Sequence, residues 1–153
     1  MSAASAIDDG VILSEAVRLV NEGIEVTFPV NGRSMRPFIE GGRDSVVLVK
    51  PGTVKRFDVV LARTEDNRHV VHRVLAVEGD RVTLMGDGNL CGRETCDMCG
   101  VLAKVTHVVR PGGKRIPLEM PRMRVAAKLW VTLLPFRRIL LKLYRVKNRI
   151  TDR

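Results

Sequence analysis

The chain has 153 residues, of which 45% are apolar and 28% are charged, and its net charge is +9. This length suits one domain with a single core, and the composition excludes a wholly disordered chain. The apolar stretches are far shorter than the roughly 20 residues of a membrane-spanning helix. The first residues lack the basic start and the apolar run of a secretory signal, so we expect a cytoplasmic protein.

The positive charge is concentrated near the C-terminus. Residues 1–103 carry 12 Lys and Arg against 15 Asp and Glu, whereas residues 104–153 carry 14 against 2. A segment this basic attracts polyanions such as anionic phospholipid, nucleic acid or an acidic protein. The rest of the chain is not basic, so the sequence does not predict a nucleic-acid-binding domain.

The predicted elements begin with a helix. From Gly10 to Gly23, apolar residues recur every three to four positions, which predicts one short amphipathic helix that ends at Gly23. Residues 24–30 predict a strand, and the turn-forming sequence of residues 31–37 follows it. Further short runs rich in Val predict strands at residues 45–50, 58–62, 69–77, 81–85 and 101–109. Short strands separated by turns favour a mainly β domain.

The C-terminal segment has a different pattern. Pro135 is expected to kink or divide a helix over residues 123–146. One stripe of this helix is apolar (Trp130, Leu133, Phe136, Leu140, Leu143) and another is basic (Arg138, Lys142, Arg145, Arg149). Such a helix either lies on an anionic membrane surface or packs on the domain or a partner with its basic face solvated. We therefore divide the chain into an N-terminal helix (1–23), a β-rich domain (24–120) and a basic amphipathic C-terminal helix (121–153).

Three short segments carry residues with catalytic chemistry. Ser34 lies in a turn entered through a glycine, His72 lies in the middle of an apolar strand, and Asp87 lies between two glycines. Alone, each residue is typical of an ordinary turn or strand. A serine hydroxyl is a poor nucleophile at neutral pH and needs a neighbouring base, and histidine is suited to that task.

In this order and spacing, the segments resemble the signal peptidase I family and its LexA-like relatives. The resemblance covers about residues 26–89, and we expect it to continue to residue 109. It rests on Ser34-Met35-Arg36-Pro37, which is similar to the segment of the family's nucleophile, and on His72-Arg73-Val74, which is similar to the strand of its general base. Three more segments match: Gly42-Arg43-Asp44-Ser45-Val46, Asp58-Val59-Val60 and Gly86-Asp87-Gly88-Asn89.

The resemblance implies a signal peptidase/LexA-like β-rich catalytic fold and a serine endopeptidase. In having histidine at the position of the base, the sequence is similar to the archaeal and endoplasmic-reticulum signal peptidases. Bacterial signal peptidases and LexA-like proteins have lysine at that position. The family's N-terminal membrane anchor has no counterpart in this sequence, and neither has a DNA-binding helix-turn-helix. We therefore expect a compact member, cytoplasmic or peripherally bound to a membrane, rather than a processor of exported preproteins or a repressor.

The resemblance also assigns roles to residues. Ser34 is the expected nucleophile and His72 the expected base, so activity should rise through about pH 6 to 7.5 as the imidazole loses its proton. Asp87 either orients His72 or holds its own glycine turn together. The backbone N–H of Ser34 is the expected oxyanion donor. The residues expected to bind substrate around it are Gly32, Met35, Pro37 and Phe38.

Two other histidines compete for the role of base. His69 and His72 cannot both face Ser34, because residues three apart in a strand point to opposite faces. His107 lies in another predicted strand. We choose His72 because Arg-Val follows it, as it follows the base in the family.

Three cysteines fall within a nine-residue segment, Cys91, Cys96 and Cys99. A structural zinc site needs four ligands, and His107 or Asp97 could supply the fourth. Only one half of the usual paired pattern is present, and a redox pair of Cys96 with Cys99 is a further alternative. We expect reduced thiols in a loop, and neither a metal ion nor a cofactor.

The sequence therefore predicts a serine endopeptidase that acts on a peptide or protein substrate bound as an extended strand. The alternative is a catalytically inactive binding module of the same fold, recruited to a membrane or a partner by the basic C-terminal helix.

Overall fold

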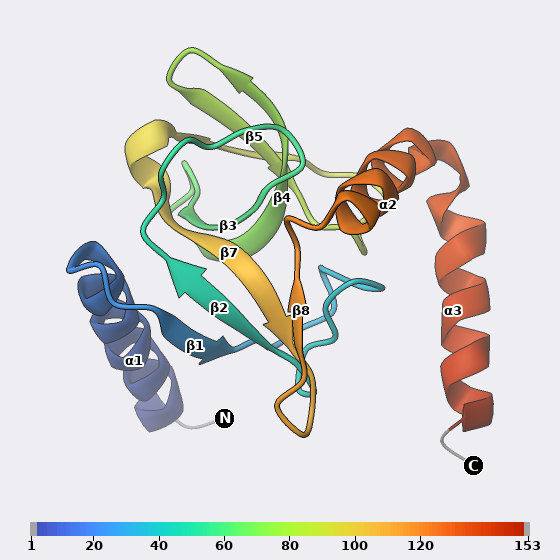
Figure 1. The fold of residues 1–153 in the computed structure, drawn as a ribbon, viewed down its shortest axis with the longest axis horizontal. Coiled ribbons are helices and arrows are strands. Elements are labelled where there is room, and N and C mark those ends of the chain that lie inside the picture. The colour runs from blue at the N-terminus through green and yellow to red at the C-terminus, as the bar shows by residue number, and fades with distance from the viewer. Residues whose placement is uncertain (1–2, 152–153) are drawn as a thin grey trace.

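The computed structural model describes residues 3–151 of the protein, and the side chains of residues 10–151. Helices flank a central sheet on two sides, with α1 on one side and α2 and α3 on the other (Figure 1). The elements are α1 (Ala3–Asn21), β1 (Val26–Pro29), β2 (Ser45–Val49), β3 (Val59–Arg63), β4 (His69–Glu78), β5 (Arg81–Met85), β6 (Glu94–Asp97), η1 (Met98–Gly100), β7 (Val101–Val109), β8 (Arg115–Pro117), α2 (Pro121–Thr132), η2 (Leu134–Phe136) and α3 (Arg137–Thr151).

The eight strands form one sheet in which the paired strands are antiparallel. Its order is β1-β2-β7-β3-β4-β5-β6, and β8 pairs with β7. In β3 and β4, Val60 lies opposite His72 and Leu61 lies opposite Val71. The predicted mainly β fold is confirmed.

The sheet separates two clusters of buried apolar side chains. Val59 and Leu61 of β3 belong to the first cluster, and the alternate residues Val60 and Ala62 belong to the second. The first cluster also takes side chains from α1, β2, β7 and the loop after β1, and the second takes them from β5, β6 and the loop before β3. The same alternation continues in β4, where Val71 packs on the first cluster and Val70 and Val74 pack on the second. A slip of one residue would exchange the two faces of β4, so the two clusters fix its register.

Two strands were not predicted from the sequence. β6 falls in the cysteine segment, which we expected to be a loop, and β8 has only three residues. Cys96 of β6 lies opposite Val82 of β5 and is buried, so a cysteine acts here as a small apolar core residue. The N-terminal helix also begins earlier than expected, at Ala3 rather than Gly10.

The C-terminal segment forms two helices, as Pro135 predicts: α2 ends at Thr132, and α3 begins at Arg137. Trp130, which the sequence places on the apolar stripe of this segment, packs on the domain. Its indole N–H donates to the Asp87 carbonyl at 2.8 Å, and its ring packs edge-on against Phe38. Among the described helices, none combines the length and the apolar character that crossing a membrane requires.

Candidate active site

Ser34 lies in the loop that joins β1 to β2. Backbone hydrogen bonds close this loop at its base, from Gly42 N–H to the Val30 carbonyl at 2.8 Å and from Val30 N–H to the Asp44 carbonyl at 3.2 Å. The Asp44 carboxylate is buried and is bound by the guanidinium groups of Arg43 and Arg110. The loop is thus held in place at its base while its tip carries the serine.

The turn of residues 86–89 packs directly against the serine loop. Gly88 N–H donates to the Ser34 carbonyl at 2.8 Å. A β-carbon on Gly86 would lie 2.3 Å from that carbonyl oxygen, and one on Gly88 would lie 2.5 Å from the Arg33 carbonyl oxygen. Such approaches are too close for any side chain, so this contact requires glycine at both positions.

His72 is buried in β4 and has a carboxylate partner. Its Nδ1 lies 3.0 Å from Oε2 of Glu94 in β6, and 4% of the residue is exposed. Burial lowers the pKa of His72, although the charge of Glu94 and its hydrogen bond act in the opposite direction. The imidazole is therefore neutral at pH 7. With Nδ1–H donating to Glu94, Nε2 carries the lone pair that can accept a proton.

Asp87 binds a different residue. Its two carboxylate oxygens accept hydrogen bonds from Nε and Nη2 of Arg73 at 2.8 and 2.7 Å, and both side chains are buried. Within the described residues, His72 and Asp87 share no hydrogen bond. Glu94, and not Asp87, is the carboxylate that contacts His72. The sequence offered no sign of this contact, because it depends on the pairing of β5 with β6.

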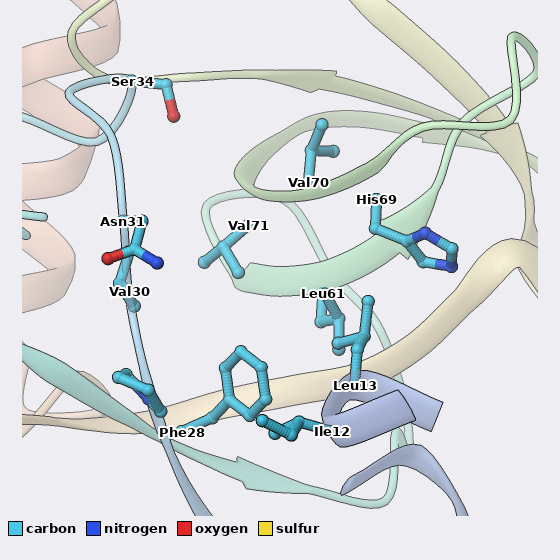
Figure 2. Close-up of a pocket in the computed structure, with 11 residues that line it drawn as sticks. Ile12, Leu13, Phe28, Val30, Asn31, Ser34, Leu61, His69, Val70 and Val71 are labelled. Atoms are coloured by element: carbon cyan, nitrogen blue, oxygen red, sulfur yellow. The ribbon is translucent and has the colours of Figure 1, made fainter. Parts of the chain in front are cut away.

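A cavity of about 330 Å³ opens beside Ser34. Figure 2 shows the Ser34 hydroxyl directed into it, with Val70 and Val71 further along and the His69 ring at the far end, pointing away from the serine. The Ser34 hydroxyl and its backbone N–H form no hydrogen bond within residues 10–151, the range whose side chains the structure describes. His72 is not among the residues that line this cavity.

The four residues expected to bind substrate lie elsewhere. Gly32, Met35, Pro37 and Phe38 do not line the cavity. Met35 is buried and belongs to the first core cluster, and Phe38 packs against that cluster. The walls are formed instead by residues that include Leu13 of α1, Phe28 of β1 and Leu61 of β3.

The cysteines and His107 do not gather into a metal site. Cys91 and Cys99 are exposed, Cys96 is buried, and all three are free thiols. His107 contacts the hydroxyl of Thr106 through Nδ1 at 3.0 Å. In the described part of the chain, no three His, Cys, Asp or Glu residues are placed to hold a metal ion.

Comparison with known proteins identifies the family. The model of the family described as signal peptidase, peptidase S26 matches residues 10–95. The matched range contains Ser34, His72, Asp87 and Glu94. Searches of curated proteins and of solved structures found no match. Because the matched region spans more than half of the chain, the protein belongs to the peptidase S26 signal peptidase family, whose members are serine-type peptidases.

Proposed function

We propose that the protein is a serine endopeptidase in which Ser34 is the nucleophile and His72 the general base. The observation that carries this proposal is a buried, neutral histidine whose Nδ1 is held by Glu94 at 3.0 Å, so that Nε2 remains to accept a proton. Ser34 lies in a separate loop and directs its hydroxyl into a cavity that residues of β4 also line, and this hydroxyl has no hydrogen-bond partner among residues 10–151.

The reaction transfers an acyl group twice. As Ser34 Oγ attacks the peptide carbonyl, Nε2 of His72 takes the hydroxyl proton, and it then delivers that proton to the leaving amine. Water cleaves the resulting ester by the same route in reverse, with His72 again as base. The Ser34 N–H, which has no acceptor within residues 10–151, is proposed to bind the oxyanion.

Two features support His72 as the base. Met85 pairs with Arg73, so the register continued by one residue brings Gly86 to the level of His72, and Gly86 is the residue against which Ser34 packs. Val70, on the same face of β4 as His72, reaches the edge of the cavity, whereas Val71 and Leu61 line it from the other face of the sheet. His69 is a weaker candidate because its ring points away from Ser34 (Figure 2).

Glu94 is proposed as a positioning residue. By accepting the Nδ1 proton it selects the tautomer with a free Nε2 and fixes the ring. Its charge also raises the pKa of His72 against the effect of burial. The variant Glu94→Gln should therefore lower kcat/KM at least about tenfold and move the acidic limb of the pH profile to lower pH. A merely structural role for Glu94 would leave that limb in place.

The cavity indicates the kind of peptide that would bind. Its walls are mainly aliphatic and aromatic side chains, with Asn31, Ser34 and His69 as its polar residues. About 330 Å³ accommodates one or two small or aliphatic side chains of a substrate near the scissile bond.

The test is peptide hydrolysis followed by mass spectrometry, with peptides that carry small aliphatic residues at varied positions. We expect Ser34→Ala to abolish cleavage and His72→Gln to lower kcat/KM by about 10² to 10⁴. His69→Gln should lower kcat/KM less than about tenfold, because its ring lines the cavity but points away from Ser34, and the control His107→Gln, outside the cavity, should stay within about threefold of the wild type. Equal cleavage by Ser34→Ala and wild type would refute the proposal, and loss of activity in the His69 variant alone would transfer the role of base to that residue.

A further inference from the structure

The helix α3 presents three distinct faces. At 100° per residue, Arg137, Leu141 and Tyr144 fall on one face, and these side chains are buried or half-buried against the domain. The opposite face is apolar and exposed. It consists of Ile139, Leu143, Val146 and Ile150, which are 49% to 71% exposed, and we call these four residues the apolar stripe. Exposed apolar side chains in an unbroken row mark an interaction surface.

The third face of α3 is basic. Arg138, Lys142, Arg145 and Arg149 lie between the buried face and the apolar stripe, and we call them the basic row. Within residues 137–151 the helix has no Asp or Glu, and none of the four forms an ion pair with a side chain of residues 10–151. A solvated face of an ordinary surface helix mixes both signs of charge, so this arrangement favours an anionic partner.

The basic row borders two hollows beside the serine loop. Their volumes are about 240 and 430 Å³, and both are lined by Arg33, Arg36 and Arg145. Glu40 is the acidic residue in their lining, and its carboxylate already binds Arg36 and the Tyr144 hydroxyl. The positive charge of α3 therefore continues onto the loop that carries Ser34.

We propose that α3 docks the protein on an anionic phospholipid bilayer, with the apolar stripe inserted at the level of the headgroups and the basic row binding lipid phosphates. An apolar face bordered by Lys and Arg is the pattern of interfacial helices. Nucleic acid would use the basic row but leave the apolar stripe in water. A second copy would cover the stripe but bring two basic rows together, which costs electrostatic free energy.

The first test compares vesicle flotation of wild type and an apolar-stripe variant. Wild type should float with vesicles of phosphatidylglycerol and phosphatidylcholine, and not with phosphatidylcholine alone. Ile139→Gln/Leu143→Gln should weaken binding at least about tenfold, because the two aliphatic side chains that it replaces no longer enter the membrane interface. The control Val11→Gln/Ile24→Gln changes two equally apolar residues, 62% and 47% exposed, at α1 and the segment after it, and should float as wild type.

The second test reverses charge. Lys142→Glu/Arg149→Glu should weaken binding to the anionic vesicles at least about tenfold, because each basic residue near such a surface contributes about fivefold. The control Arg63→Glu/Arg93→Glu makes the same change of net charge at two exposed residues, one in β3 and one just before β6, and should bind as wild type. All the substituted side chains are exposed, so circular dichroism and unfolding midpoints should match throughout.

Three results would overturn the proposal. These are equal flotation with neutral vesicles, unchanged binding by the apolar-stripe variant, and a dimer in light scattering that this variant converts to a monomer. Ser34→Ala should float as wild type, so failure of the docking proposal and failure of the proposed peptidase activity are distinguishable.

Discussion

Removal of the Asp87 carboxylate should destabilise the fold rather than act on His72. Asp87 is fully buried, and Arg73, 4% exposed, binds it through two hydrogen bonds of 2.8 and 2.7 Å. In Asp87→Ala the guanidinium would remain buried without a countercharge, which costs about 3 to 5 kcal/mol. At about 2 to 4 °C per kcal/mol for a chain of this size, Tm should fall by roughly 6 to 20 °C.

Urea unfolding followed by circular dichroism measures this change. Asp80→Ala, the same substitution at an exposed aspartate, should alter the free energy of unfolding by less than about 0.5 kcal/mol. Asp87→Ala/Arg73→Met should lose less than the two single variants together, because it removes the unpaired cation as well. If Asp87→Ala unfolds at the same midpoint as Asp80→Ala but loses activity as Glu94→Gln does, then Asp87 acts at His72 and the reasoning fails.

Three further predictions concern the site and the thiols. Because burial lowers the pKa of His72, the midpoint of the rise in activity should lie at a lower pH than the about 6.5 of an ordinary imidazole. Stability should fall as the pH drops below about 6.5, because the unfolded state then binds the additional proton; pH profiles of kcat/KM and of the urea midpoint measure both effects. Gly86→Ala should lower both activity and Tm because its β-carbon meets the Ser34 carbonyl, whereas Gly52→Ala, with open space around it, should change neither. Iodoacetamide should label Cys99 in the native protein long before Cys96, whose pKa is raised by burial; equal rates by peptide mass spectrometry would contradict the packing of β6.

The sequence predicted the elements whose signals are local. Short runs rich in Val predicted β5 and β7 with the same first and last residues that the structure shows. Pro135 predicted the break between α2 and α3. Ser34 and His72 were found as candidates through short segments of adjacent residues. Each of these depends on neighbours along the chain, which a sequence displays directly.

The remainder of the site depends on pairing between distant segments. Glu94 meets His72 across 22 residues because β6 pairs with β5, and a four-residue strand with a cysteine at its centre has a weak pattern. Met35 was expected to bind substrate, but an apolar residue next to a serine has the same appearance whether it lines a subsite or enters the core. The partner of Asp87 was also undetermined, because Arg73 becomes its neighbour only when β4 and β5 align.

The C-terminal helices are part of the site and not an appendage to it. Trp130 donates to the Asp87 carbonyl, and Arg137, 1% exposed, donates to the carbonyls of Gly86 and Asn89 at 3.3 and 3.1 Å. These bonds hold the turn that packs against Ser34, and a buried carbonyl that loses its donor costs about 1 to 3 kcal/mol. Removal of residues 121–151 would therefore disturb the serine loop as well as any membrane contact. Substitutions confined to the exposed faces of α3 separate the two effects, because Arg137 lies on the buried face of α3 and Trp130 belongs to α2.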